Sequence, residues 1–141
     1  MEDAPKDVLF RLAIEMALPE LLNFCATSKK IDEKVCQRRD IWNYKLKNEF
    51  PSYDGWLEKT TPREVYTTLY GLTVLKEKLN IKETIKELYF LQKLDLNYNQ
   101  IEEIPKELGN LTNLQRLSLS DNQIKEIPKE VANLTNLTIY K

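Results

Sequence analysis

A repeat of 23 residues constrains the fold of this chain more than any other feature of its sequence. Apolar residues, one asparagine and one proline recur at the same spacing in two consecutive segments. The first segment carries Leu91, Leu94, Leu96, Asn99, Ile101, Ile104, Pro105, Leu108 and Leu111. The second carries, 23 positions later, Leu114, Leu117, Leu119, Asn122, Ile124, Ile127, Pro128, Val131 and Leu134. A period of this length indicates a stack of similar units, because one such unit cannot bury its apolar face alone.

Each unit is predicted to contain a short strand followed by a turn. Leu94 and Leu96 alternate with Asp95, so the leucines should face the core and the aspartate should face solvent. Asn99 and Asn122 follow the strands, where a short amide can donate to and accept from backbone groups that have lost their strand partners. The proline and the Lys-Glu pair that come next favour a helical or 3₁₀ turn on the outer side. Stacking of these units makes the strands pair in parallel.

The pattern resembles the leucine-rich repeat family in its short form. The resemblance implies a small solenoid whose sheet binds other proteins, and hence an α/β fold with parallel strands. Counting back by the same step, Gly71 and Thr73 stand where strand leucines belong, so a degenerate first repeat is expected around residues 70 to 90 as a cap. Counting forward, a third copy begins at Leu137 and Tyr140, both at core positions.

The candidate target-binding residues are the solvent-facing positions on and after the strands, because these line the exposed face of the sheet. The alternative for each of these residues is that its side chain is only exposed to solvent and binds nothing. Tyr98 is the strongest single candidate, since an exposed aromatic ring offers a large contact area at low entropic cost. The predicted set is Lys93, Asp95, Asn97, Tyr98, Arg116, Ser118, Ser120 and Asp121.

The first 50 residues contain no glycine and are predicted to form helices. Apolar residues at helical spacing form two faces, and Asp40 is a natural N-cap for a third helix that bears Ile41 and Trp42. Cys25, on the second of these faces, is expected to be an inert buried thiol. The chain then has a loop near Pro51 to Gly55. A capping box at Thr61 to Glu64 predicts a linking helix over residues 62 to 70.

The order of residues in this helical region resembles an F-box. The resemblance rests on Pro5 to Leu9, Leu18 to Cys25, Ser28 and Lys29, Ile41 and Trp42, and Phe50 and Pro51. It implies a three-helix module that docks on the Skp-type adaptor of a cullin–RING ubiquitin ligase. By the same resemblance, the adaptor-facing residues are Pro5, Val8, Leu9, Leu21 and Leu22. The alternative is that these five residues only close a small helical core.

Composition narrows the classes of function. The 21 lysines and arginines are balanced by 22 acidic residues, so nucleic acid is not an expected partner. The N-terminus is acidic and the following apolar stretch is broken by Arg11 and Glu15, which predicts neither export nor a membrane span. With two cysteines and no histidine, the chain lacks the ligands for a zinc site and the cysteines for a disulfide framework. We therefore expect an intracellular protein, cytoplasmic or nuclear, without metal or cofactor.

The expected organisation is an F-box-like module at 1–50, a loop and linking helix at 51–70, and leucine-rich repeats at 71–141. An enzyme is not expected, because a cysteine nucleophile needs an activating base and none accompanies either cysteine. The expected function is that of a non-enzymatic adaptor, a substrate receptor of an SCF-type ubiquitin ligase, with an unknown protein target on the repeats. The alternative is a stand-alone binding scaffold whose helices only cap the solenoid.

Overall fold

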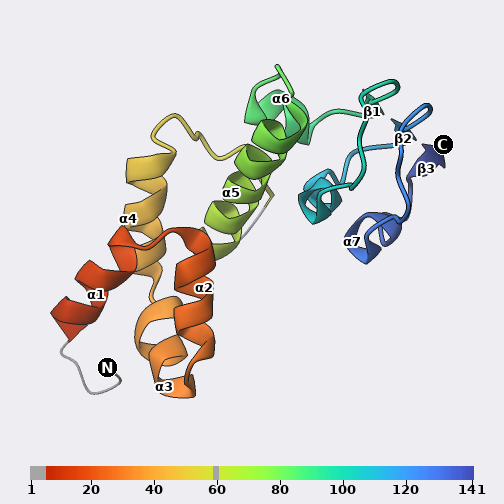
Figure 1. Cartoon of the computed structure of the whole chain (residues 1–141). Coiled ribbons are helices and arrows are strands. Elements are labelled where there is room, and N and C mark those ends of the chain that lie inside the picture. The colour runs from red at the N-terminus through yellow and green to blue at the C-terminus, as the bar shows by residue number, and fades with distance from the viewer. Residues whose placement is uncertain (1–5, 59–60) are drawn as a thin grey trace. The chain divides into compact units, whose positions relative to one another are not determined.

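The computed structural model of this chain describes residues 6–58 and 61–141 and contains two compact units, residues 1–70 and 71–141 (Figure 1). The prediction of N-terminal helices followed by a parallel sheet is confirmed. None of the described helices is both long and apolar enough to cross a membrane. The helical unit contains α1 (Lys6–Glu15), α2 (Leu18–Ala26), α3 (Lys29–Ile31), the π-helix η1 (Asp32–Cys36), α4 (Arg39–Glu49) and the start of α5 (Pro62–Leu79).

The helical unit has its own apolar core, to which every one of these elements contributes. More than three helices build it, because α3 and η1 form a further helical segment between α2 and α4. Ser28 starts that segment by accepting a hydrogen bond from the Ile31 backbone N–H at 3.1 Å. Asp40 is predicted to be the N-cap of α4, but it lies in the first turn of that helix. There its side chain accepts a hydrogen bond from the Ile41 backbone N–H at 3.0 Å. The core includes Leu9, Ala13, Leu21, Ile31, Val35, Ile41, Trp42 and Tyr66.

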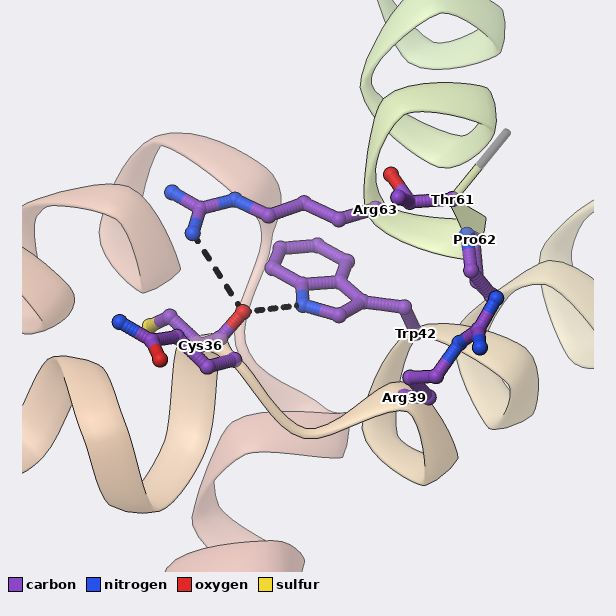
Figure 2. Close-up of a pocket in the computed structure, with 7 residues that line it drawn as sticks. Cys36, Arg39, Trp42, Thr61, Pro62 and Arg63 are labelled. Carbon is purple, nitrogen blue, oxygen red and sulfur yellow. Dashed lines mark hydrogen bonds between the residues drawn. The ribbon is translucent and has the colours of Figure 1, made fainter. Parts of the chain in front are cut away.

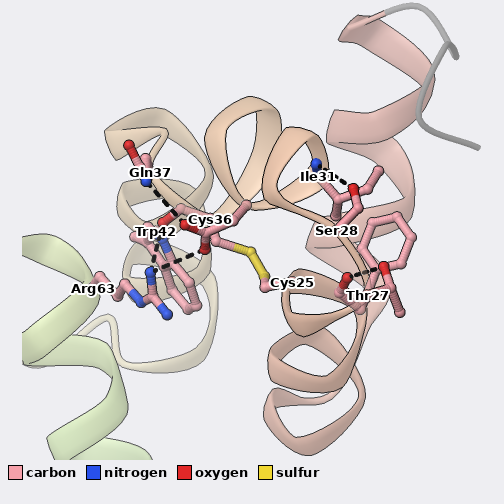
Figure 3. The surroundings of a disulfide bond; sticks show 10 residues. Cys25, Thr27, Ser28, Ile31, Cys36, Gln37, Trp42 and Arg63 are labelled. Atoms are coloured by element: carbon pink, nitrogen blue, oxygen red, sulfur yellow. Dashed lines mark hydrogen bonds and ion pairs between the residues drawn. A yellow bond between two sulfur atoms is a disulfide. The ribbon is translucent and has the colours of Figure 1, made fainter.

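A disulfide joins Cys25 of α2 to Cys36 at the end of η1 (Figure 3). Their Cα atoms lie 6.0 Å apart, a separation that a disulfide can span. Both cysteines are buried, as predicted for Cys25, but neither is a free thiol. The prediction of an inert thiol at Cys25 is therefore wrong, because the sulfur atom of this residue belongs to a disulfide. The sequence shows only that the cysteines are eleven residues apart, and it is the reversal of the chain through α3 that brings them together.

A buried lysine ties α4 to the turn between α1 and α2. Lys45 is only 2% exposed, and its ammonium donates to the carbonyl of Met16 at 2.7 Å and to that of Ile14 at 3.5 Å. It also forms an ion pair with Glu49 at 3.2 Å. The Tyr66 hydroxyl lies 2.8 Å from each carboxylate oxygen of Glu49 and donates to that group. The charge of Lys45 is thus satisfied inside the core, as a buried charge requires.

Helix α5 is longer than the predicted linking helix. It begins as expected, because the Thr61 hydroxyl oxygen accepts a hydrogen bond from the Glu64 N–H at 3.2 Å. It then continues to Leu79, so that Gly71 and Thr73 lie in a helix and not in the strand of a degenerate repeat. The physical reason is that the apolar spacing stays helical: Leu69, Leu72 and Leu75, at intervals of three residues, are all buried.

The second unit holds the repeats. After α5 come α6 (Ile85–Tyr89), β1 (Lys93–Asp95), the 3₁₀ helix η2 (Lys106–Asn110), β2 (Arg116–Ser118), α7 (Lys129–Ala132) and β3 (Thr138–Tyr140). The strands form one parallel sheet in the order β1-β2-β3 (Figure 1). The segments between the strands carry η2 and α7, which pack against each other. Each repeat is therefore a strand with a return path, as the 23-residue period predicts.

The register between β2 and β3 departs from the period. Leu94 pairs with Leu117, 23 residues later, whereas Leu117 pairs with Ile139, 22 residues later. Ile139 therefore takes the inward position in β3, and Tyr140 points outward and is 48% exposed. The prediction that Tyr140 occupies a core position is wrong. A shift of one residue in a strand exchanges its two faces, and the shift puts the branched apolar residue inside.

Candidate protein-binding surface

The outward side chains of the three strands form two rows across the sheet. The first row is Lys93, Arg116 and Thr138, and the second is Asp95, Ser118 and Tyr140. All of these residues are exposed except Ser118, which is half-buried. We call these six residues the strand face. The parallel register holds neighbours in each row about 4.8 Å apart, so that side chains from different repeats form one continuous surface.

Two of the predicted binding residues, Asn97 and Ser120, help to hold the repeats together. The Asn97 side-chain oxygen accepts a hydrogen bond from the Ser120 N–H at 2.6 Å. The Asn97 N–H in turn donates to a carboxylate oxygen of Asp95 at 2.9 Å. Both Asn97 and Ser120 are only partly exposed. The structure thus gives these two positions a part in the stack, in addition to any contact with a ligand.

Tyr98 and Asp121 occupy equivalent positions in successive repeats, just beyond the strands. Both have a left-handed backbone conformation, with φ of 58° and 60°. This conformation costs a residue with a side chain about 1–2 kcal/mol relative to the right-handed one, and glycine is the residue that avoids the cost. At the first of these turns the chain nevertheless carries a tyrosine that is 78% exposed. The ring of Tyr98 is therefore largely exposed to solvent just beyond β1.

Sequence reasoning missed Tyr140 as a surface residue. The 23-residue step assigns it to the core, and only the shortened spacing before β3 turns it outward. The alternation of Thr138, Ile139 and Tyr140 predicts it, because two side chains that carry hydroxyl groups flank one purely apolar side chain, as in a half-buried strand. Tyr140 adds a second exposed aromatic ring to the surface that carries Tyr98.

The predicted adaptor-facing residues fall into three groups. Leu9 and Leu21 have no exposed area and belong to the core of the helical unit, so they cannot contact a partner in this conformation. Their positions on the inner faces of α1 and α2 explain the burial. Val8 and Leu22, one residue along the same helices, are 45% and 38% exposed. Pro5 lies outside the described residues.

A pocket of about 360 Å³ opens on the helical unit beside Trp42 (Figure 2). The Trp42 indole N–H donates to the carbonyl of Cys36 at 2.8 Å, and the Arg63 guanidinium donates to the same oxygen at 3.4 Å. Arg63 also lies over the indole ring, 5.6 Å from its centroid, and 3.8 Å from Asp32. With Arg39 on the opposite wall, the pocket suits an anionic group. Arg63, however, already holds the end of η1 in place.

One group of potential metal ligands lies among the described residues. A carboxylate oxygen of Asp32 and the sulfur atoms of Cys25 and Cys36 lie within 4.8 Å of one another. Both sulfur atoms belong to the disulfide, so they are not available as thiolates. The carboxylate accepts a hydrogen bond from the Gln37 side chain at 2.9 Å. This group therefore serves to fix η1 and does not form a metal site in this state.

Comparison with known proteins finds one match, and it lies within the second unit. The family model of leucine-rich repeats, in two copies, matches residues 90–133. This range contains β1, β2 and the return segments that carry η2 and α7, and it includes no residue of the helical unit. No match was found among curated proteins or solved structures. Residues 90–133 of this chain are leucine-rich repeats.

Proposed function

We propose that this protein is a non-enzymatic adaptor that binds a protein partner on the strand face. The observation that carries the proposal is the continuous outward surface of three paired strands, next to the exposed ring of Tyr98. The exposed face of a sheet suits contacts with a protein when it carries aromatic side chains, because aromatic rings lose little conformational entropy on binding. The proposal requires no catalytic group.

We further propose that the helical unit docks on a Skp-type adaptor of a cullin–RING ubiquitin ligase. Its support is the sequence resemblance to an F-box, together with Val8 on α1 and Leu22 on α2, two exposed apolar side chains. The burial of Leu9 and Leu21 removes these two from the proposed contact, which among the described residues rests on Val8 and Leu22. In this role the protein would act in the cytoplasm or the nucleus and bring its bound partner to the ligase.

The test is to mix the purified full chain with a purified Skp-type adaptor and to measure a complex by size-exclusion chromatography. The proposal expects a complex that is lost when Val8→Glu and Leu22→Glu are introduced together. Phe90→Glu is the matched control, because Phe90 is 49% exposed and belongs to the repeat unit. Circular dichroism of each variant establishes that it is folded.

The second candidate is a stand-alone binding scaffold, in which the helical unit has no adaptor to hold. The complete burial of Leu9 and Leu21 favours it, because two of the residues that the F-box resemblance marks as contacts serve the core instead. If the folded native chain forms no complex with the adaptor, this candidate replaces the ligase role, while binding on the strand face stays in place.

A further inference from the structure

We infer that the partner on the strand face presents an acidic segment, whose carboxylates bind between Lys93 and Arg116. The inference rests on the proposed binding role of the strand face and names the chemistry of its ligand. Lys93 and Arg116 are direct register partners on β1 and β2. Two cations from different repeats are thus held side by side on the outward surface.

The two cations have no compensating anion in the described structure. Neither forms an ion pair with any residue in 6–58 or 61–141. The nearest acidic position on the same face is Asp95, and one of its carboxylate oxygens accepts a hydrogen bond from the Asn97 N–H. The third member of their row is the neutral Thr138. Within this row, therefore, no carboxylate is paired with either cation.

Like charges at directly opposed positions of neighbouring strands disfavour the sheet. A carboxylate placed between them would remove the repulsion and gain charge-assisted hydrogen bonds to both cations. The guanidinium of Arg116 can bind a carboxylate through two parallel N–H groups, and the ammonium of Lys93 adds a second point of attachment. A peptide carboxylate is small enough to bind both cations at the spacing of adjacent strands.

The rest of the strand face argues for a peptide and against a nucleic acid. Asp95 and Asp121 are exposed on or just beyond the strands, where they would repel a run of phosphates. Tyr98 and Tyr140 offer apolar contact at the same end of the strands. The complementary ligand carries carboxylates over the start of the strands and an apolar side chain over their end. An acidic peptide segment with an aromatic or aliphatic residue meets both demands.

The test is to select random peptides displayed on phage against the immobilised full chain, and to measure the enriched peptides by fluorescence anisotropy. The inference expects enrichment of acidic peptides. It also expects Lys93→Glu with Arg116→Glu to lower their affinity by about tenfold or more. The matched control is Lys125→Glu with Lys129→Glu, which makes the same change of net charge at exposed positions beyond the strands. This control should change the affinity less than about twofold, as distant screened charges do.

The outcomes separate this inference from the proposed function. Peptides that are neutral or basic, or that bind the Lys93 and Arg116 variant as well as the native chain, overturn the acidic ligand. If Tyr98→Ala still weakens those peptides, binding on the strand face stands without it. Enriched peptides that respond to neither change contradict both proposals, and so does a selection in which the folded native chain enriches no peptide. If the native chain binds a single-stranded oligonucleotide and the Lys93 and Arg116 variant does not, the ligand of the strand face is a nucleic acid and the inference of an acidic peptide is overturned.

Discussion

The side chain of Asn122 holds the turn after β2 to the turn of the preceding repeat, which contains Asn99. The Asn122 amide oxygen accepts hydrogen bonds from the backbone N–H groups of Asn99 and Ile101, each at 3.0 Å. Its amide nitrogen donates to the carbonyls of Leu96 at 2.8 Å and Leu119 at 3.0 Å. One half-buried amide thus satisfies backbone groups of two repeats. Asn99 itself is exposed, and its side chain donates to a single carbonyl in its own repeat.

Replacing Asn122 by alanine is expected to lower the free energy of unfolding by about 2–4 kcal/mol. The physical reason is that several partly buried backbone groups lose their partner at once, at about 1–3 kcal/mol for each group that stays unsatisfied. The equivalent change Asn99→Ala should cost about 1 kcal/mol or less, because water can replace its single bond. Urea unfolding followed by circular dichroism measures both variants. Equal losses in the two variants would mean that the hydrogen bonds between repeats do not set the cost.

Gly109 permits the close approach of the return segments in successive repeats. A Cβ atom at Gly109 would lie 2.8 Å from the carbonyl oxygen and 2.9 Å from the Cβ atom of Glu130. Both of these atoms are fixed by the backbone of α7, so Gly109→Ala is expected to destabilise the repeats by about 1–3 kcal/mol. Thermal unfolding measures the change as a lower Tm.

Gly71→Ala is the matched comparison for Gly109→Ala. A Cβ atom at Gly71 would meet the side-chain amide of Asn110, which can rotate away. Alanine is also favoured over glycine inside a helix by about 1 kcal/mol. We expect Gly71→Ala to leave Tm unchanged or to raise it. A loss of Tm as large as that of Gly109→Ala would mean that backbone contact at Glu130 is not what sets the cost.

The repeat period predicts the structure of residues 71–141 well wherever one repeat has the same spacing as the repeat before it. The alternation around Asp95 places Leu94 and Leu96 in the core, and the asparagine after the strand makes the backbone bonds expected of it at Asn122. The period fails at Tyr140, because one residue is missing before β3 and the faces exchange. It fails again at Gly71, because the apolar spacing there fits a helix as well as a strand position.

The helical unit is harder to predict, because its important relationships join residues that no local pattern connects. Leu9 and Leu22 both lie on apolar stretches, and only the packing of the helices decides that the first is buried and the second exposed. Lys45 reads as a solvated residue of an amphipathic helix, yet it reaches backbone carbonyls about thirty residues earlier in the chain. The exposure of the candidate residues is therefore better predicted on the repeats than on the helices.

Tyr66 should make stability depend on alkaline pH. Burial raises the pKa of its phenol above the ordinary value of 10, and the hydrogen bond to Glu49 and the negative charge of that carboxylate raise it further. Because the pKa in the folded state is higher than in the unfolded state, this stabilisation is fully present below about pH 10. It is lost as the pH rises from there towards the folded pKa. We expect the free energy of unfolding of the native chain to fall above about pH 10.

Tyr66→Phe tests this dependence. The variant should lose about 1–3 kcal/mol at neutral pH, the usual worth of a hydrogen bond to a charged group, and its stability should fall less steeply above about pH 10. Urea unfolding at pH values from about 7 to 11 provides both quantities. Tyr98→Phe removes a hydroxyl from an exposed ring and should keep the native profile. The same alkaline slope in Tyr66→Phe as in the native chain would assign that slope to other groups.

Reduction of the Cys25–Cys36 disulfide is expected to destabilise the helical unit. The bond joins two residues that lie eleven positions apart in the sequence, one in α2 and one at the end of η1. Closing a loop of this size in the unfolded chain is worth about 3 kcal/mol in the loop-entropy description. Adding dithiothreitol should therefore lower the urea midpoint of the native chain, whereas Cys25→Ala with Cys36→Ala should start lower and not respond.

The same pair bears on where the protein acts. The proposed ligase role belongs to a reducing compartment, in which disulfides are rare and the two cysteines would be thiols. Free thiols can be alkylated in freshly lysed cells that express the protein. Mass spectrometry then shows directly whether Cys25 and Cys36 are thiols or form a disulfide. Two alkylated cysteines fit the adaptor role, with the helical unit stable by its apolar core alone. A pair protected from alkylation until it is reduced would make the disulfide part of the working fold and would count against a cytoplasmic or nuclear ligase partner.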